Sequence, residues 1–314
     1  MSKRLIGVDV GGTKMAVAML DGTTLHPPQV QPTDTRGGEQ LVEQLVAGVQ
    51  RAGEACAVGV AVPSVVDFAT GRVRSSVNVP LQDIALREVL RERLGVPVYV
   101  DNDAACAALA EAYDDDGSLI ARHLVMFTVG TGVGGGIVIH GRVYRGATGA
   151  AAVLGHTSVG ADLRTSPFAA SERYPQPGSL ESLASGSALN ELGALHGLPE
   201  KTTIDAALQG DAGALAAIEL LGRRLGIGIA NAINTFDPDV VVVGGGASIA
   251  GELLLAPARE EAARFTLTGV GTRTEIRRAR HGSLAGVRGA ALLAGHEAEH
   301  EREQAAATAG AGAP

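Results

Sequence analysis

The feature that most constrains the fold is a pattern that occurs once in each half of the chain. Residues 5–20 consist of two apolar, β-branched segments around a turn that contains Gly11 and Gly12. Residues 123–139 repeat this arrangement around the glycine-rich run 130–136. Strand-like segments alternate with helix-like segments after each repeat. The sequence therefore predicts two similar α/β lobes with a cleft between them.

Periodicity and turn residues divide the rest of the chain. We expect a first lobe at 1–116, completed by a C-terminal helix at 284–304, and a second lobe at 117–283. The small-residue tail 305–314 is predicted to be disordered. Loops are expected at 22–37 and at 159–179. The second of these segments shows little hydrophobic periodicity. The other predicted elements are helices at 39–52, 83–94, 104–113, 188–195, 203–208 and 214–236, a further helix after the glycine triplet 244–246, and strands at 57–62, 98–100 and 240–243.

Composition excludes several classes of protein. Lys plus Arg is 26 and Asp plus Glu is 34, a net charge of −8 that argues against a nucleic-acid or polybasic membrane surface. Aromatic residues are 3% and tryptophan is absent, so base-stacking platforms are not expected. No apolar run suits a membrane span, and residues 1–9 do not resemble a signal peptide. We expect a cytoplasmic protein that binds neither nucleic acid nor membrane.

The first glycine turn carries the groups that a polyphosphate requires. Asp9 ends a strand, residues 11–13 form the turn, and Lys14 follows as one of three lysines in the chain. Backbone N–H groups and one ammonium bind phosphates, and a carboxylate can organise Mg²⁺. The spacing is not that of a P-loop. An ordinary hairpin with solvated ends explains the same residues.

The residue spacing of the second glycine run matches a dinucleotide-binding fingerprint. Gly130, Gly132 and Gly135 satisfy G-x-G-x-x-G, but that fingerprint needs a helix after the turn. Residues 137–139 favour a strand, which argues against a Rossmann site. A hairpin that presents N–H groups to an anion and a hairpin without a ligand both remain open.

The chain resembles the ROK family of carbohydrate kinases, which belongs to the hexokinase and actin-like ATPase superfamily. The resemblance runs from Ile6 to about Ala294, and its pieces occur in the family's order. These pieces are residues 7–14, Val62-Pro63, Val77-Asn78-Val79-Pro80, residues 101–104, residues 128–136, Leu154-Gly155-His156, Leu180-Glu181 and residues 242–246. The resemblance implies a two-lobed α/β fold of the actin-like ATPase, or ribonuclease H-like, type with the active site in the interlobe cleft.

The resemblance also implies roles for the matched positions. Asp103 matches the catalytic base, which takes the proton of a sugar hydroxyl. Without the resemblance, Asp103 or Asp101 could equally cap the helix that follows. The positions that match sugar contacts are Asn78, Asn102, Asp103, His156 and Glu181. Those that match the nucleotide site are Asp9, Gly11, Gly12, Thr13, Lys14, Thr131, Gly132, Gly134, Gly135, Gly244, Gly245 and Gly246.

The sequence departs from the family's pattern at positions that the family uses for sugar binding and for its zinc loop. The family usually has Ala-Gly-Glu-x-Gly-His where this chain reads Ala-Ala-Val-Leu-Gly-His at 151–156, so Val153 replaces a sugar-binding glutamate. The family's zinc loop is rich in cysteine, but residues 162–179 contain none. Because zinc needs three or four ligands and His156 alone cannot supply them, we expect no structural zinc.

These observations favour an ATP- and Mg²⁺-dependent kinase that phosphorylates a hydroxyl, expected to be the primary one, of a hexose-like small molecule. The change at Val153 leaves a C7-cyclitol or aminosugar kinase of a secondary-metabolite pathway as an alternative. A catalytically inactive sugar-binding paralogue is a second alternative. A sugar-responsive repressor is disfavoured, because the kinase-like segment starts at Leu5 and leaves no room for a DNA-binding module. We also expect a homodimer.

Overall fold

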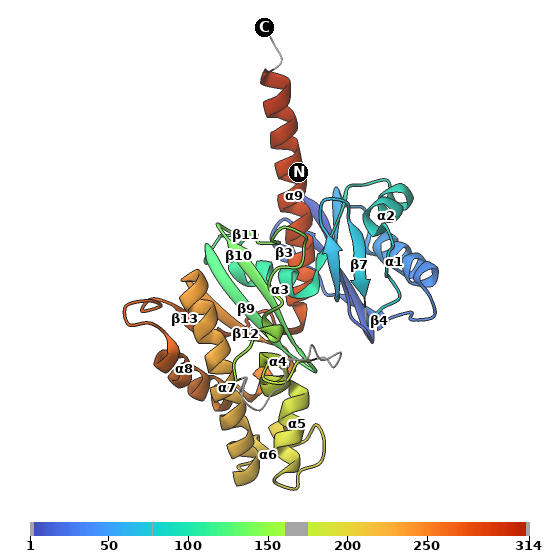
Figure 1. The fold of residues 1–314 in the computed structure, drawn as a ribbon. Helices are drawn as coiled ribbons and strands as arrows, with labels where there is room; N and C mark the ends of the chain where they lie inside the picture. The colour runs from blue at the N-terminus through green and yellow to red at the C-terminus, as the bar shows by residue number, and fades with distance from the viewer. Residues whose placement is uncertain (1–2, 77, 161–174, 312–314) are drawn as a thin grey trace. The chain divides into compact units, whose positions relative to one another are not determined.

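The structure, a computed structural model, describes residues 3–76, 78–160 and 175–311. The chain forms two compact units, which Figure 1 follows by residue number. The first consists of Met1–Ile120, Val143–Ala151 and Ser283–Pro314, and the second of Ala121–Arg142 and Ala152–Gly282. The sequence did not indicate that the short segment Val143–Ala151 returns to the first unit.

The first unit is built on a mixed sheet. Its strand order is β3-β2-β1-β5-β8, and β4 also pairs with β2. The pair β1–β2 is antiparallel, whereas β1–β5 and β5–β8 are parallel. A separate hairpin joins β6 and β7. The strands are β1 (Arg4–Val10), β2 (Lys14–Asp21), β3 (Thr24–Leu25), β4 (Gln29–Pro32), β5 (Ala57–Val62), β6 (Ser64–Asp67), β7 (Arg72–Ser76) and β8 (Val98–Asn102).

Helices cover both faces of this sheet, and the alternation within β1 shows why. Ile6 and Val8 pack into the cluster that contains the apolar side of α1 (Gly38–Ala52) and α2 (Leu86–Leu94). Leu5 packs into the cluster on the opposite face, with α3 (Asp103–Ala112) and α9 (Ala285–Ala311). Figure 1 shows α1 and α2 on one side of the sheet and α9 on the other. Because neighbouring strand residues point to opposite faces, Asp9 lies on the face of α9.

Glycines let α9 approach the sheet closely. A Cβ added to Gly7 would overlap the carbonyl oxygen of Val287, and one added to Gly59 would overlap that of Ala290. Gly289 of α9 meets the backbone of Cys106 in α3 in the same way. The glycines therefore bring the beginning of α9 up to the end of β1, where Asp9 stands.

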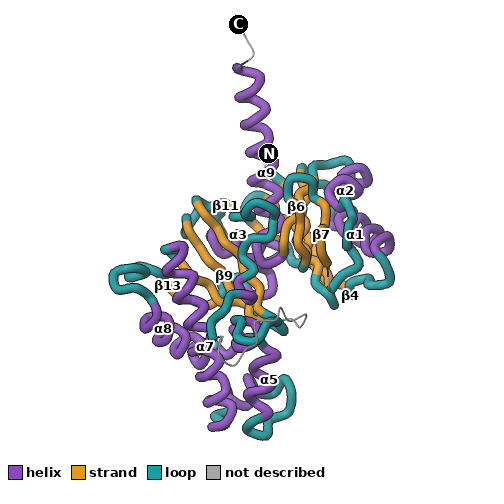
Figure 2. The backbone as a smooth tube through the Cα atoms, viewed as in Figure 1, coloured by secondary structure: helices purple, strands orange, loops and turns teal. Residues whose placement is uncertain are grey.

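The second unit has a five-stranded sheet with the order β11-β10-β9-β12-β13. Its helices pack against one face of this sheet and share a single apolar cluster with it. Figure 2 shows this separation of strands and helices. The strands are β9 (His123–Val129), β10 (Val133–Ile139), β11 (Arg142–Val143), β12 (Val240–Gly244) and β13 (Glu275–Arg278). The helices are α4 (Leu180–Ala184), α5 (Gly186–Ala194), α6 (Thr203–Leu208), α7 (Ala212–Phe236) and α8 (Glu252–Phe265), with short 3₁₀ turns at η1 (Leu154–His156), η2 (Gly246–Ala250) and η3 (Gly282–Leu284).

Several predicted elements differ from those observed. The second glycine turn ends at Gly132, because residues 134–136 lie in β10 and pair with β9. The expected loop at 22–37 contains β3 and β4, which extend the sheet through β2. The final helix continues to Ala311, so the prediction of disorder from residue 305 is wrong for residues 305–311.

Other differences concern elements that the sequence did not predict, namely β6, β7, β11, β13 and α4. Most of the expected loop at 159–179 lies outside the described residues, as do residues 312–314. None of the helices in the described ranges is long and apolar enough to cross a membrane.

Candidate active site

The β1–β2 turn is held in a fixed shape by backbone contacts. The N–H of Gly11 donates to the carbonyl of Lys14 at 2.9 Å. The hydroxyl of Thr33 donates to the carbonyl of Gly11 at 2.6 Å. A Cβ at Gly12 would lie 3.4 Å from the Cβ of Asn78. The structure thus brings Asn78, a predicted substrate contact, against the predicted phosphate turn, while Val77 of the same motif lies outside the described residues.

Asp9 is a partly buried carboxylate at the end of β1. Burial, with the negative charge of Asp103, raises the pKa of Asp9 from 3.8 to about 6, and Lys14 opposes the rise. A Cβ at Gly286 would overlap the Asp9 carboxylate, so this group lies against the first turn of α9. A helix N-terminus favours negative charge. The Asp9 carboxylate therefore responds to the charges of both Asp103 and Lys14.

The junction of β8 and α3 presents Asp103. The N-cap of α3 is Asn102, whose Oδ1 accepts hydrogen bonds from the N–H groups of Ala104 at 3.0 Å and Ala105 at 3.1 Å. The capping interpretation of Asp103 or Asp101 is therefore wrong. Asp103 is the first helical residue, and its Oδ1 accepts from the N–H of Ala104 at 2.8 Å.

Burial also shifts the protonation equilibrium of Asp103. Burial raises its pKa from 3.8 to about 6, although hydrogen bonds, first from Ala104, oppose the rise. A base with a pKa near the working pH is ionised and still accepts a proton effectively. A carboxylate of this kind can accept a proton from a hydroxyl.

The β9–β10 turn in the second unit is also fixed by hydrogen bonds. The N–H of Gly130 donates to the carbonyl of Gly132 at 2.9 Å. Two groups at the start of α5 bond to the turn. The N–H of Gly186 donates to the carbonyl of Gly130 at 2.7 Å, and the hydroxyl of Ser187 donates to the backbone carbonyl of Thr131 at 2.9 Å. The carbonyl groups of the turn are thus occupied by the protein, and sequence reasoning did not identify Gly186 or Ser187.

Glu181 supports this turn. Its Oε2 accepts a hydrogen bond from the N–H of Val133 at 2.8 Å, and a Cβ at Gly132 would overlap the same oxygen. At Gly135 a Cβ would lie 2.6 Å from Leu154 Cδ1. Gly134 is the register partner of Thr128 in the antiparallel β9–β10 pair. The structure therefore connects Glu181, a predicted sugar contact, with the predicted nucleotide side.

A pocket of 490 Å³ opens beside the β9–β10 turn. Its wall includes Thr131 and Gly246, both of which the sequence placed at the nucleotide site. The remaining lining residues are Gly130, Gly186, Ser187, Leu189, Asn190, Lys201, Thr203, Ile204 and Ala247. Apolar side chains with a few polar groups are typical of a ligand pocket.

Three polar residues of this pocket escaped sequence reasoning. Lys201 has a φ of 62°, and its N–H donates to Oδ1 of Asn190 at 2.9 Å. Thr203 is buried, and its hydroxyl has no hydrogen-bond partner among the described residues. A non-glycine residue in the left-handed region is a signal of a functional site, but it is visible only in the structure.

Gly244 and Gly245 serve the fold around this pocket. A Cβ at Gly244 would lie 2.7 Å from Met126 Cε. Gly245 has a φ of 82°, and its Cβ would lie 2.5 Å from the carbonyl oxygen of Val129. Of the predicted glycine triplet, Gly246 is the member that lines the pocket.

The divergent motif at 151–156 surrounds η1. Val153 precedes η1 and is 51% exposed, so its side chain is accessible to a ligand. A Cβ at Gly155 would overlap the carbonyl oxygen of Val133, which places η1 against β10. His156 ends η1 and is exposed. No group of three or more His, Cys, Asp or Glu side chains suited to a metal ion occurs within the ranges that the structure covers.

Ala152 has a φ of 65° at a position where the family's pattern has glycine. The left-handed conformation disfavours a Cβ by about 1–2 kcal/mol. Ala152→Gly is therefore expected to raise the free energy of unfolding by about 1 kcal/mol, after allowing for the greater chain entropy of glycine. Thermal unfolding measures the effect. Ala151→Gly is the control, because Ala151 is not among the residues with a positive φ and should lose stability.

The two glycine hairpins, each on a mixed sheet covered by helices, define an α/β protein with the actin-like ATPase fold. A model of the ROK family matches residues 5–297. The chain belongs to the ROK family, as its motifs indicated.

Three similar proteins illustrate the relationship. A glucokinase from Halalkalibacterium halodurans is 32% identical over 92% of this chain and 94% of its own length. An N-acetyl-D-glucosamine kinase from Photobacterium profundum is 33% identical over 91% of this chain and 98% of its own. The crystal structure of a ROK family glucokinase from Streptomyces griseus, in complex with glucose and AMPPNP, has a TM-score of 0.75 and 30% identity, covering 93% of this chain and 99% of that one.

Proposed function

We propose that the protein is an ATP-dependent kinase that transfers a phosphoryl group to a hydroxyl, the primary one, of a hexose or hexose-like small molecule. Membership of the ROK family supports this proposal. So do the two relatives, a glucokinase and an N-acetyl-D-glucosamine kinase, which align over almost all of the chain. The Streptomyces griseus glucokinase binds glucose together with an ATP analogue, which supports ATP as the donor.

The observation that carries the proposal is the environment of Asp103. Burial raises the pKa of its carboxyl group to about 6, and its charge acts on Asp9, on which Lys14 also acts. In the proposed reaction the acceptor oxygen forms a bond to the terminal phosphorus while the bond from that phosphorus to ADP breaks. The hydroxyl proton moves to Asp103, which makes the oxygen a better nucleophile.

The second unit supplies features that suit the donor. N–H groups at the β9–β10 turn can bind phosphates, because its carbonyl groups are already bonded within the protein. The 490 Å³ pocket beside the turn is large enough for a nucleoside. Mg²⁺ would neutralise phosphate charge and enter with the nucleotide, and Asp9 is the carboxylate best suited to orient its hydration shell. We propose no structural zinc.

The acceptor site is proposed to include Asn78, Asn102, His156 and Glu181. Two of these side chains also make structural hydrogen bonds, since Asn102 caps α3 and Glu181 accepts the N–H of Val133. Val153 offers an accessible apolar surface where a carboxylate is usual in the family. An aminosugar or C7 cyclitol that needs no acceptor there is therefore the alternative substrate.

ATP turnover against a panel of hexoses, aminosugars and C7 cyclitols tests the proposal. One compound of the panel should be phosphorylated in an Mg²⁺-dependent reaction that forms ADP and a phosphate ester. If the protein binds sugars but forms no ester with any of them, it is a binding protein, and the kinase proposal is wrong. ATP hydrolysis measured without an acceptor provides the background.

Val153→Glu is expected to shift the preference between acceptors toward glucose. A buried hydroxyl without a partner costs about 1–3 kcal/mol, so the restored acceptor should improve the ratio of kcat/KM values by roughly 5- to 150-fold. Competition between glucose and the best substrate of the panel measures the ratio. Leu195→Glu is the matched control, because Leu195 is 81% exposed in the same unit and outside the motif. An unchanged ratio in Val153→Glu would remove this residue from the acceptor site.

A further inference from the structure

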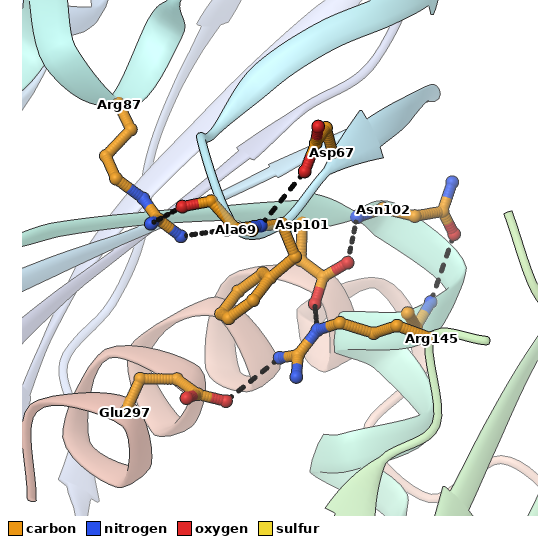
Figure 3. Close-up of polar contacts among 9 residues, drawn as sticks. Asp67, Ala69, Arg87, Asp101, Asn102, Arg145 and Glu297 are labelled. Carbon is orange, nitrogen blue, oxygen red and sulfur yellow. Dashed lines mark hydrogen bonds and ion pairs between the residues drawn. The ribbon is translucent and has the colours of Figure 1, made fainter. Parts of the chain in front are cut away.

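Arg145 belongs to a network of buried charges that the proposed reaction does not yet use. Its Nε lies 2.7 Å from Oδ2 of Asp101, and its Nη2 lies 3.0 Å from Oε1 of Glu297 on α9. Asp101 is 3% exposed. Figure 3 shows Arg145 extending between the two carboxylates. One guanidinium therefore neutralises a buried carboxylate on β8 and connects it to a helix.

The same Asp101 carboxylate also holds the backbone of the next residue. Its Oδ1 accepts a hydrogen bond from the N–H of Asn102 at 2.9 Å, as drawn in Figure 3. Asn102 is the N-cap of α3, and Asp103 follows it as the first helical residue. A change in the position of Asp101 is therefore transmitted through one hydrogen bond to the junction that orients Asp103.

Arg145 itself is held in place on three sides. Its guanidinium carbon lies 3.4 Å from the centre of the Phe68 ring, a stacked arrangement that suits a planar cation. Its carbonyl accepts the N–H of Ala151 at 3.1 Å and closes a loop. Gly146 and Gly149 give this loop the positive φ values that it needs, 67° and 80°. The loop, Phe68 and Glu297 fix the guanidinium independently of Asp101.

Burial makes Asp101 dependent on this partner. Burial raises the pKa of Asp101, and Arg145 is the first group that opposes the rise. Without a cation, a buried carboxylate becomes protonated or moves toward water. Either response weakens the bond to Asn102, because a protonated or displaced carboxyl is a poorer acceptor.

We propose that Arg145 is a positioning residue for phosphoryl transfer, which acts through Asp101 and the backbone of Asn102 to orient the Asp103 carboxylate. The proposal rests on the proposed function of Asp103 as the base. It assigns Arg145 no contact with substrate or nucleotide. A merely structural ion pair would stabilise the fold but leave the turnover of folded molecules unchanged.

Four variants separate these roles. Arg145→Met removes the charge and keeps much of the length, and Arg145→Lys keeps the charge without the planar bridge. The double variant Arg145→Met with Asp101→Asn removes both charges but keeps an oxygen that can accept the N–H of Asn102. Arg87→Met is the matched control, because Arg87 also lies over Phe68, at 5.0 Å, but bonds the carbonyls of Phe68 and Ala69.

The first readout is which of the two constants, kcat or KM, changes in each variant, measured on folded protein. Arg145→Met is expected to lower kcat by roughly 100-fold, the effect of a displacement of about 1 Å at a catalytic group. The KM for ATP should not change, because the pocket proposed for the nucleoside is built by the second unit and contains none of the residues in the Arg145 network. Arg145→Lys should lose less, and the double variant should recover most of kcat. Arg87→Met should lower the melting temperature without changing kcat.

The second readout does not depend on activity. Hydrogen exchange at the N–H of Asn102 should accelerate in Arg145→Met, return toward the wild-type rate in the double variant and stay unchanged in Arg87→Met. Wild-type exchange in Arg145→Met overturns the inference, and so does a double variant in which neither exchange nor kcat recovers. If the wild type phosphorylates no acceptor, the proposed function fails, while the exchange rates still decide whether Arg145 holds the β8–α3 junction in place through Asp101.

Discussion

Asp103→Asn is expected to lower kcat by roughly 100- to 10,000-fold, the contribution that general base catalysis makes to enzymatic rates. Asparagine keeps the shape of the side chain and the oxygen that accepts the N–H of Ala104, but it cannot take the hydroxyl proton. Substrate and ATP should therefore bind with nearly unchanged affinity. Steady-state kinetics and calorimetric titration of each ligand measure the two effects.

The same substitution is expected to stabilise the fold at neutral pH. Because the pKa of Asp103 rises from 3.8 to about 6 on folding, the folded protein binds this proton more tightly than the unfolded chain. Its contribution to stability is thus greatest at low pH and is lost as the pH rises from about 4 through about 6. At pH 7 the ionised group costs about 2–3 kcal/mol, which Asp103→Asn should largely recover.

The control for this prediction is a carboxylate outside the proposed site. Asp205→Asn replaces an exposed carboxylate in the first turn of α6 and should not change kcat. Measurable turnover at the wild-type rate in Asp103→Asn would show that Asp103 is not the base. A loss of sugar binding with little loss of kcat would make it a binding residue instead.

Much of the fold follows from local patterns in the sequence. The run at 57–62 is a strand with the predicted bounds, because all six of its residues are apolar or glycine and all are buried. β13 was missed, since Glu275–Arg278 reads Glu-Ile-Arg-Arg and is a strand through its pairing with β12 at the sheet edge. Such an edge strand carries no apolar alternation of its own.

The site was predictable where a short motif carries it and not where the fold assembles it. Asp101 and Asp103 were considered as caps and Asn102 was missed, because the residue types do not reveal the backbone conformation that makes Asn102 the N-cap. Asn190, Lys201 and Thr203 meet at the pocket from different segments, without a common motif. Arg145 pairs with Asp101 across 44 positions, which no periodicity in a single sequence reveals.

Gly132→Val is expected to weaken ATP binding strongly. A Cβ at this position would overlap Oε2 of Glu181, the oxygen that accepts the N–H of Val133. The substitution must therefore displace either Glu181 or the turn, and both changes move the N–H groups proposed to bind phosphate. Each hydrogen bond to a charged group contributes about 1.5–3 kcal/mol, so the loss of one should raise the Kd for ATP by roughly 10- to 150-fold.

Two further variants locate the cause. Gly130→Ala adds a methyl group to the same turn at a point where, among the described residues other than its chain neighbours, no atom lies within 4 Å, so it should leave the melting temperature of the unliganded protein unchanged. Glu181→Gln keeps a carbonyl oxygen for the N–H of Val133 and should largely keep ATP affinity, although it removes the charge. If Gly132→Val binds ATP as the wild type does, the β9–β10 turn is not the phosphate wall. If Glu181→Gln loses ATP affinity as fully as Gly132→Val, the charge of Glu181 matters more than the shape that it gives the turn.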